Sequence, residues 1–275
     1  MQQFSGELGK MKTVHDSPVQ YFMRLGELEV PMNPLIGRRI QLSHGGQIQC
    51  VGCGRKLKKT YQQGYCFPCT QTLAECDICI LRPERCHYHL GTCRQPSWGE
   101  KHCMQQHFVY LANSSGLKVG ITRHTNIPTR WMDQGATQAL PILKVGSRLQ
   151  SGLLETAFKE EVSDRTDWRK MLRGEAEPLD LAEIRDALFE KKQDTFAKLR
   201  DQFGEGEIEL LHEAEQRSFN FPVREYPVKI RSLNLDKTPE IESTLQGIKG
   251  QYLIFEAGVI NMRKYQGYEV ALAYA

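Results

Sequence analysis

Hydrophobic and polar residues alternate most clearly near the two ends of the 275-residue chain. Near the start, residues 21–30 (YFMRLGELEV) and 36–49 (IGRRIQLSHGGQIQ) alternate as strands do, and the turn-rich segment 31–35 separates them. Residues 219–230 and 250–275 return to the same pattern, with breaks at glycine and asparagine. Both ends are therefore expected to be β-rich.

We assign these ends to a β-rich N-terminal segment, residues 1–49, and a β-rich C-terminal segment, residues 218–275. A short similarity links them, because PLIGRRIQL and TLQGIKGQYL both place Leu-x-Gly before a β-like run. We expect the two ends to pair into one sheet or barrel, with contacts between the surroundings of Ile40 and Tyr252. The rest of the chain would then be inserted between them.

The middle of the chain, residues 106–175, has the pattern of a compact α/β unit. Its expected elements are strand, strand, helix, strand and helix, over residues 107–113, 117–122, 127–136, 139–147 and 151–162. Since only Asn113-Ser114-Ser115-Gly116 separates the first two runs, the unit opens with a hairpin. Together with the ends, this order predicts an α+β fold.

An acidic helical segment, residues 176–217, follows the α/β unit. From Leu179 to Phe203 the apolar residues fall mostly on one helical face, and Asp180 is suited to cap the helix N-terminus. The pattern predicts a surface helix that packs on the α/β unit.

All nine cysteines lie between residues 50 and 103, so they belong to one local module, which we assign to residues 50–105. Cys50 and Cys53 form one Cys-x-x-Cys pair, and Cys66 and Cys69 form another. Because zinc takes four such ligands tetrahedrally, the two pairs predict one structural zinc site. A redox function would need only one pair.

Cys76 and Cys79 begin a second set of cysteines, which continues with Cys86, Cys93 and Cys103. Five thiols are one more than a tetrahedral zinc needs. The expected arrangement uses Cys76 and Cys79 with two of the other three. A histidine ligand, or an exchange of ligands with the first site, is the alternative, so the sequence predicts one or two structural zinc ions.

The net charge of +3 predicts no partner, but the charges are unevenly distributed. Residues 51–150 hold 13 Lys and Arg against 5 Asp and Glu, whereas residues 151–217 hold 11 against 18. A basic region of this kind suits DNA or RNA, and an uneven solvated surface is the plain alternative. The cations expected to contact nucleic acid are Arg55, Lys56, Lys58, Lys59 and Arg123.

The chain has no apolar stretch of 18 residues, and its start, MQQFSGELGK, lacks the hydrophobic region of a signal peptide. We therefore expect no membrane insertion and a cytoplasmic location.

Residues 107–165 resemble the GIY-YIG nuclease superfamily, whose small domain has a hairpin, helix, strand and helix in this order. Val109-Tyr110 stands where the first motif keeps its tyrosine. Lys118-Val119-Gly120 stands where the second motif keeps Tyr-Ile-Gly, so Lys118 replaces a tyrosine. Gly120 would let the backbone come close to the site.

Arg130 falls where the superfamily has the arginine of its first helix, and Glu155 where the last helix carries a metal-binding glutamate. The resemblance implies that Tyr110 orients or deprotonates a water and that Arg130 neutralises phosphate charge. It implies that Glu155 holds Mg²⁺ or Mn²⁺. Gln134 stands where the superfamily often has a histidine.

The order of modules along the whole chain also resembles a bacterial, zinc-ribbon-containing domain family of unknown activity. We therefore expect a zinc-stabilised nucleic-acid-binding protein with a divergent GIY-YIG-like domain, which would act as a metal-dependent endonuclease if catalytic. The alternatives are a DNA- or RNA-binding protein without catalysis and a zinc-based protein-interaction adaptor.

Overall fold

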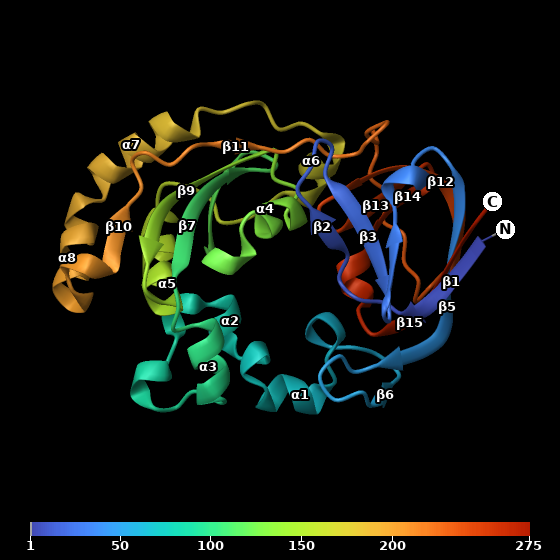
Figure 1. The fold of residues 1–275 in the computed structure, drawn as a ribbon, viewed down its shortest axis with the longest axis horizontal. Coiled ribbons are helices and arrows are strands. Elements are labelled where there is room, and N and C mark those ends of the chain that lie inside the picture. Colours follow the sequence, from blue (N-terminus) through green and yellow to red (C-terminus); the bar gives the residue numbers. More distant parts are fainter. Residues whose placement is uncertain (1) are drawn as a thin grey trace.

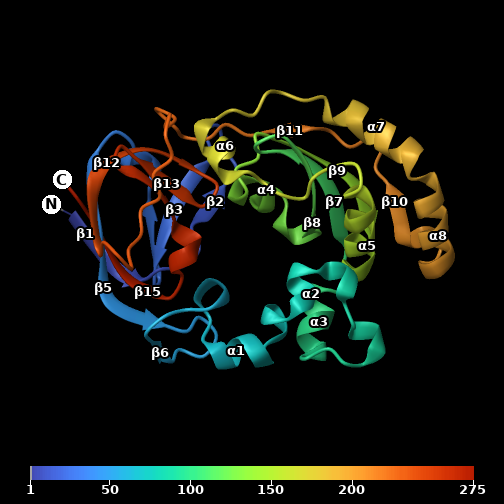
Figure 2. The same ribbon diagram turned by 180° about the vertical axis from the view of Figure 1, so that it is seen from behind.

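The computed structural model describes residues 2–275 and has a mixed α+β fold with three antiparallel sheets. Figure 1 shows a β-rich part containing both chain ends and an α/β part, which carries the helices α5 (Arg148–Phe158), α7 (Leu181–Lys191) and α8 (Gln193–Phe203). The cysteine-rich segment joins them along one side, and Figure 2 shows the same arrangement from behind. Within residues 2–275, no helix is long and apolar enough to span a membrane.

The largest sheet joins the two ends of the chain, as expected. Ile40 pairs with Ser243 on one side and with Tyr274 on the other, so two C-terminal strands flank the same N-terminal strand. The strand order is β1-β15-β5-β12-β13-β14, with β6 paired to β5. Their bounds are β1 Gln2–Glu7, β5 Arg39–Gln49, β6 Lys56–Leu57, β12 Glu240–Lys249, β13 Tyr252–Phe255, β14 Gly258–Asn261 and β15 Tyr268–Tyr274.

A three-stranded sheet packs on this large sheet through a common hydrophobic core. Its strands are β2 (Lys12–Val14), β3 (Gln20–Leu25) and β4 (Leu28–Pro31). The expected strand over residues 21–30 is therefore a hairpin. Its turn contains Gly26, whose φ of +60° lies in the left-handed region that glycine adopts without strain.

The α/β unit has the expected order of elements. Its sheet runs β10-β9-β7-β8, and β11 pairs with β9. Helix α5 begins earlier than expected because Ser147 caps it by accepting a hydrogen bond from Gln150 N. The bounds are β7 His107–Asn113, β8 Leu117–Arg123, α4 Thr129–Asp133, β9 Gln138–Val145, α5 Arg148–Phe158, α6 Trp168–Arg173, β10 Ile208–Leu210 and β11 Arg217–Ser218.

Strand β7 is buried on both faces, which ties the α/β unit to the rest of the protein. Val109 and Leu111 belong to one hydrophobic cluster with Leu154 of α5. Tyr110 lies in the other cluster, which contains Trp131 and the core of the β-rich part. Successive residues of a strand point to opposite faces, so β7 contributes to two cores.

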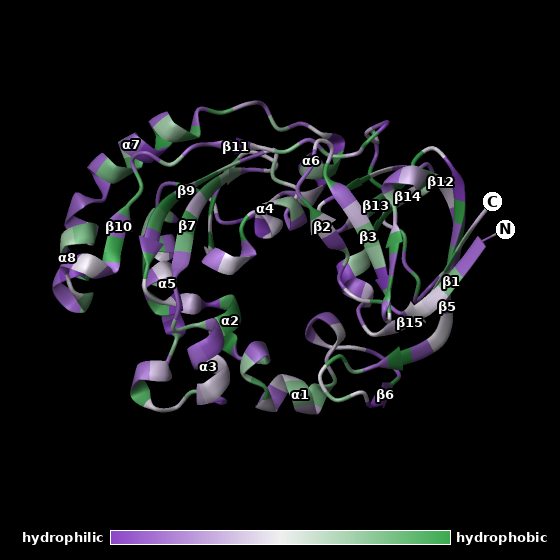
Figure 3. Ribbon diagram, viewed as in Figure 1, coloured by the Kyte–Doolittle hydropathy of each residue, from purple (hydrophilic) through white to green (hydrophobic). Residues whose placement is uncertain are grey.

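The expected helix over residues 179–203 is two helices, α7 (Leu181–Lys191) and α8 (Gln193–Phe203). Asp180 caps α7 as expected, accepting hydrogen bonds from Ala182 N and Glu183 N. The break falls at Lys192, whose buried ammonium contacts Glu160 at 2.6 Å. The hydrophobic pattern of the helix does not predict this ion pair, because the two residues lie far apart in the sequence. In Figure 3, α8 is mainly hydrophilic while strands such as β10 are hydrophobic.

Residues 219–230, expected to form a strand, make only an isolated bridge between Val223 and Gly247. Pro222 and Pro227 lack the N–H groups that a ladder requires. The cysteine-rich segment holds three short helices, α1 Phe67–Thr72, α2 Ile78–Leu81 and α3 Pro96–His102. The 3-10 helices are η1 Asn33–Leu35, η2 Gln62–Gly64, η3 Ala74–Cys76, η4 Pro83–Arg85, η5 Tyr88–Leu90, η6 His124–Asn126, η7 Glu205–Glu207 and η8 Met262–Tyr265.

Candidate functional site

A cleft of about 470 Å³ runs along β8, the edge strand of the α/β sheet. It is lined from several parts of the chain, including the hairpin, α4, α5, the cysteine-rich segment and η8. These parts surround the middle of the molecule in Figure 1. The five candidate catalytic residues all line this cleft: Tyr110, Lys118, Gly120, Arg130 and Glu155.

Tyr110 and Gly120 are direct partners in the hairpin. A Cβ at position 120 would lie 2.6 Å from the Tyr110 hydroxyl oxygen and 2.7 Å from the adjoining ring carbon. Glycine is therefore required here because the tyrosine ring covers the backbone. The hydroxyl donates a hydrogen bond to Gln134 Oε1 at 2.8 Å, which fixes the ring.

Gly120→Ala is expected to destabilise the protein by about 1–3 kcal/mol, because the added methyl overlaps the Tyr110 ring. The free energy of unfolding from urea titration measures this. Gly45→Ala is the matched control, since a Cβ there has no neighbour within 4 Å. In a Tyr110→Ala background the cost of Gly120→Ala should disappear, and an unchanged cost would contradict the overlap.

Burial raises the pKa of Tyr110, although the nearby charge of Arg130 lowers it. The phenol is therefore protonated at neutral pH and acts as a hydrogen-bond donor. Lys118 differs, because burial and the charge of Arg130 lower its pKa to about 8, while Glu155 and Asp164 raise it. Of these two side chains, Lys118 is the one that changes protonation near neutral pH.

Glu155 reaches the cleft from α5, with 12% of its side chain exposed. Burial raises its pKa, and the charge of Lys159 lowers it. The Lys159 ammonium lies 3.4 Å from Glu155 and 3.0 Å from Asp164. The two carboxylates thus converge on one cation. They are suitable oxygen ligands for a divalent ion, which would have to displace this ammonium.

Two further arginines line the cleft. Arg148, in the first turn of α5, donates to Ile80 O at 2.7 Å. A cation in the first turn of a helix is unfavourable, because it lies near the positive end of the helix dipole. This unfavourable position is the signal in the sequence that could have marked Arg148 as a functional residue. Arg263 of η8 donates to Gln63 Oε1 at 2.9 Å. It lies far from the hairpin in sequence, and no local pattern indicates it.

The cations expected to bind nucleic acid fall into different places. Arg123 lines the cleft. Lys59 lines a neighbouring pocket, which it shares with Arg263. The remaining three are exposed but line neither of these two pockets: Arg55, Lys56 and Lys58.

The first two cysteine pairs come together as expected. The sulfur atoms of Cys50, Cys53, Cys66 and Cys69 all lie within 4.8 Å of one another. Burial raises the pKa of Cys50, but backbone N–H groups, including that of Cys66 at 3.1 Å from its sulfur, bring it down to about 6. Because four sulfur atoms at these distances can close around one tetrahedral ion, this four-cysteine cluster fits a structural zinc site.

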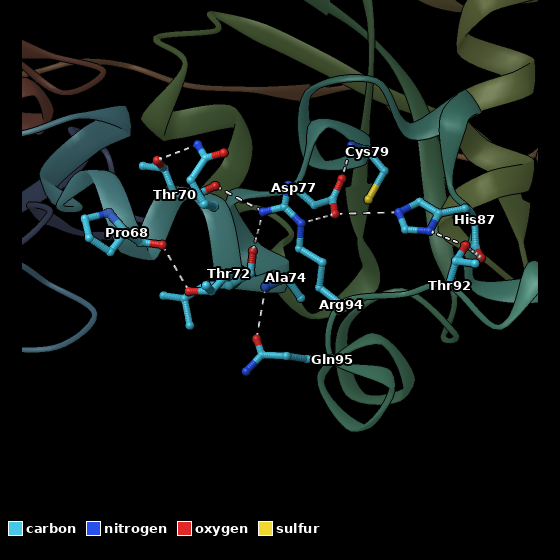
Figure 4. Close-up of polar contacts among 12 residues, drawn as sticks. Pro68, Thr70, Thr72, Ala74, Asp77, Cys79, His87, Thr92, Arg94 and Gln95 are labelled. Carbon is cyan, nitrogen blue, oxygen red and sulfur yellow. Dashed lines mark hydrogen bonds and ion pairs between the residues drawn. The ribbon is translucent and has the colours of Figure 1, made fainter.

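Arg94 connects this cluster to the following cysteine loops. Its guanidinium donates to Thr70 O at 3.0 Å and pairs with Asp77 at 2.6 Å (Figure 4). Asp77 also caps α2 by accepting from Cys79 N, and it faces His87 Nε2 at 3.6 Å. These contacts fix the second group of cysteines relative to the first.

A family model described as "Protein of unknown function (DUF2797)" matches residues 37–270. The matched range includes the cysteine-rich segment and all the residues that line the cleft. No curated protein and no solved structure matches the chain.

Proposed function

The chain belongs to the DUF2797 family, whose activity is unknown, and we propose that it binds the phosphate backbone of DNA or RNA in the cleft along β8. One observation carries the proposal. The cleft gathers five cations, none of which has a carboxylate partner within 4.0 Å among residues 2–275. They are Lys118, Arg123, Arg130, Arg148 and Arg263.

Unpaired cations that are partly withdrawn from water are costly, because they lose hydration without gaining a counter-charge. Burial lowers the pKa of Arg148 and of Arg263, which reflects this cost. A phosphate group would offset it, since guanidinium groups bind phosphate oxygens through paired hydrogen bonds. The basic character of residues 51–150 would add a longer-range attraction.

The proposal is tested by fluorescence anisotropy with labelled single-stranded and duplex DNA and RNA over a series of salt concentrations. Arg130→Ala and Arg263→Ala are each expected to weaken binding about tenfold, because a hydrogen bond to a charged group contributes on the order of 1.5 kcal/mol. Each should also flatten the salt dependence. Lys58→Ala is the matched control, as Lys58 is exposed and does not line the cleft.

If Lys58→Ala and Arg130→Ala weakened nucleic-acid binding equally, the cations between the first two cysteine pairs would contribute as much as those of the cleft, which would contradict binding in the cleft alone. Absence of binding to all four nucleic acids at physiological salt would overturn the proposal. That result would favour a zinc-based protein-interaction adaptor.

Binding is expected to depend on pH through Lys118. Because its pKa is about 8, the side chain is charged below that pH and loses its charge above it. Affinity should therefore fall about tenfold between about pH 7 and pH 9.5 as one charged contact is lost. Lys118→Arg should remove this decline because arginine stays charged. Lys144→Arg, at a lysine paired with Glu209, should leave it unchanged.

A second candidate function is cleavage of the bound phosphodiester, which the GIY-YIG resemblance implies. It is favoured by the pair of carboxylates, Glu155 and Asp164, beside Lys118 in the same cleft. With Mg²⁺ or Mn²⁺ added, the protein should convert labelled DNA or RNA to shorter products, and Glu155→Gln should abolish this without weakening binding. Binding without products under either metal would exclude cleavage and leave the binding proposal intact.

A further inference from the structure

The five cysteines outside the first cluster do not form one group. Four of them line a small cavity of about 10 Å³, a volume suited to a single atom or water. Two of the four are buried and two are half-buried. They come from α2, from the two loops that follow and from the C-terminal end of α3: Cys79, Cys86, Cys93 and Cys103.

Cys76 is the cysteine left over. It does not line the cavity, although it is only three residues from Cys79. Instead it is a buried residue of η3. The cysteines that share the cavity thus include Cys79 without Cys76, whereas the expected arrangement used the two as one pair of ligands.

A competing group of metal-binding side chains is Asp77, Cys79 and His87, whose ligand atoms lie within 4.8 Å of one another. Asp77 already holds Arg94 at 2.6 Å and caps α2. His87 Nδ1 lies 2.8 Å from Thr92 Oγ1 (Figure 4). Since the Asp77 carboxylate is neutralised by Arg94, it is a weak competitor to four thiols as a zinc ligand.

We propose that Cys79, Cys86, Cys93 and Cys103 bind a second structural zinc ion. Within residues 2–275, Cys79 is the only one of the four that belongs to a group of ligand atoms within 4.8 Å of one another. Thiolate ligands lie about 2.3 Å from zinc, so binding would have to draw the four sulfur atoms toward the centre of the cavity. Zinc with four thiolates has a net negative charge. The Arg148 guanidinium donates to Cys79 O at 3.5 Å, which places a cation beside the site.

The second zinc would stiffen one wall of the cleft. Trp98 and Cys103 line both the cavity and the cleft. Arg148 N donates to Cys103 O at 2.9 Å, and the Arg148 side chain bonds Ile80 O. The ion would thus fix the backbone that positions Arg148. The proposal goes beyond the binding function and does not depend on what the cleft binds.

The metal content of the purified 275-residue chain, produced with zinc in the medium, tests the proposal. Mass spectrometry of the native protein and elemental analysis should both find two zinc ions per chain. Cys86→Ser should lose one of them, and Cys69→Ser should lose the other. Cys76→Ser is the matched control, because it removes a buried thiol of the same segment and should retain both.

One zinc ion per chain in the unmodified protein would overturn the proposal, and so would loss of an ion in Cys76→Ser. His87→Ala should keep both ions, and loss of one would assign the site to the competing group instead. If Cys86→Ser is insoluble, cobalt substitution of the unmodified protein gives the number of four-thiolate sites per chain. The sulfur-to-cobalt absorption per chain should be twice that of a single four-thiolate site. An absorption equal to that of one site would contradict the presence of a second zinc ion.

Discussion

Cys66→Ser is expected to remove the zinc from the first cluster and to unfold residues 50–73, while the α/β sheet stays folded. Cys66 is buried, and its backbone N–H donates to Cys50 Sγ at 3.1 Å, so it supports the cluster through both its sulfur and its backbone. Zinc sites of this kind contribute about 10 kcal/mol or more to the folding of small domains. The apolar residues that pack here are few, and they do not replace the metal.

Hydrogen exchange followed by mass spectrometry separates the two regions. Peptides from residues 50–73 should lose protection in Cys66→Ser, and peptides from β7 and β9 should keep it. Cys76→Ser is the control for loss of a buried thiol in the same segment. Full protection of residues 50–73 in a zinc-free Cys66→Ser protein would show that the metal does not support the fold.

Gly152→Ala is expected to destabilise the protein by about 2 kcal/mol, although the same change in a free helix would stabilise it by about 1 kcal/mol. Gly152 lies inside α5, where a Cβ would meet the backbone N of Glu84 and lie 2.5 Å from the carbonyl carbon of Pro83. Neither backbone atom can move away as a flexible side chain could. The helix docks on η4 through this bare backbone.

Thermal or urea unfolding of Gly152→Ala measures the sign of this effect. Thr156→Ala, at an exposed position of the same helix, is the matched control and should stabilise the protein by a few tenths of a kcal/mol. A stabilising Gly152→Ala would mean that η4 does not contact α5 in solution. Because η4 lies between Cys79 and Cys86, the variant should also disturb the second group of cysteines.

Local patterns predicted those parts of the fold that local physics decides. The hairpin at residues 107–122 follows from alternation and a short turn, and the capped helix at Asp180 follows from its own sequence. The same patterns missed the turn at Gly26 and the break at Lys192. The first depends on a single glycine. The second coincides with an ion pair between the buried Lys192 and an exposed carboxylate distant in the sequence.

The cleft was only partly predictable for a similar reason. Tyr110, Gly120, Arg130 and Glu155 lie on neighbouring elements of one compact unit, so their order in the sequence was informative. Arg263 reaches the cleft only because the β-rich part packs against that unit. The division of the cysteines likewise depends on which way each loop turns, and spacing alone does not determine this.

The pairing of the two chain ends has a consequence for folding during synthesis. Strand β5 is made early, but its neighbours β12 and β15 are made much later, and Arg39 meets Glu242 across 203 residues. A growing chain cannot form these pairs until the segments between them have left the ribosome, and such distant contacts form slowly. The cysteine-rich segment and the α/β sheet are therefore free to fold first, while β5 lacks these two neighbours until β12 and β15 have been made.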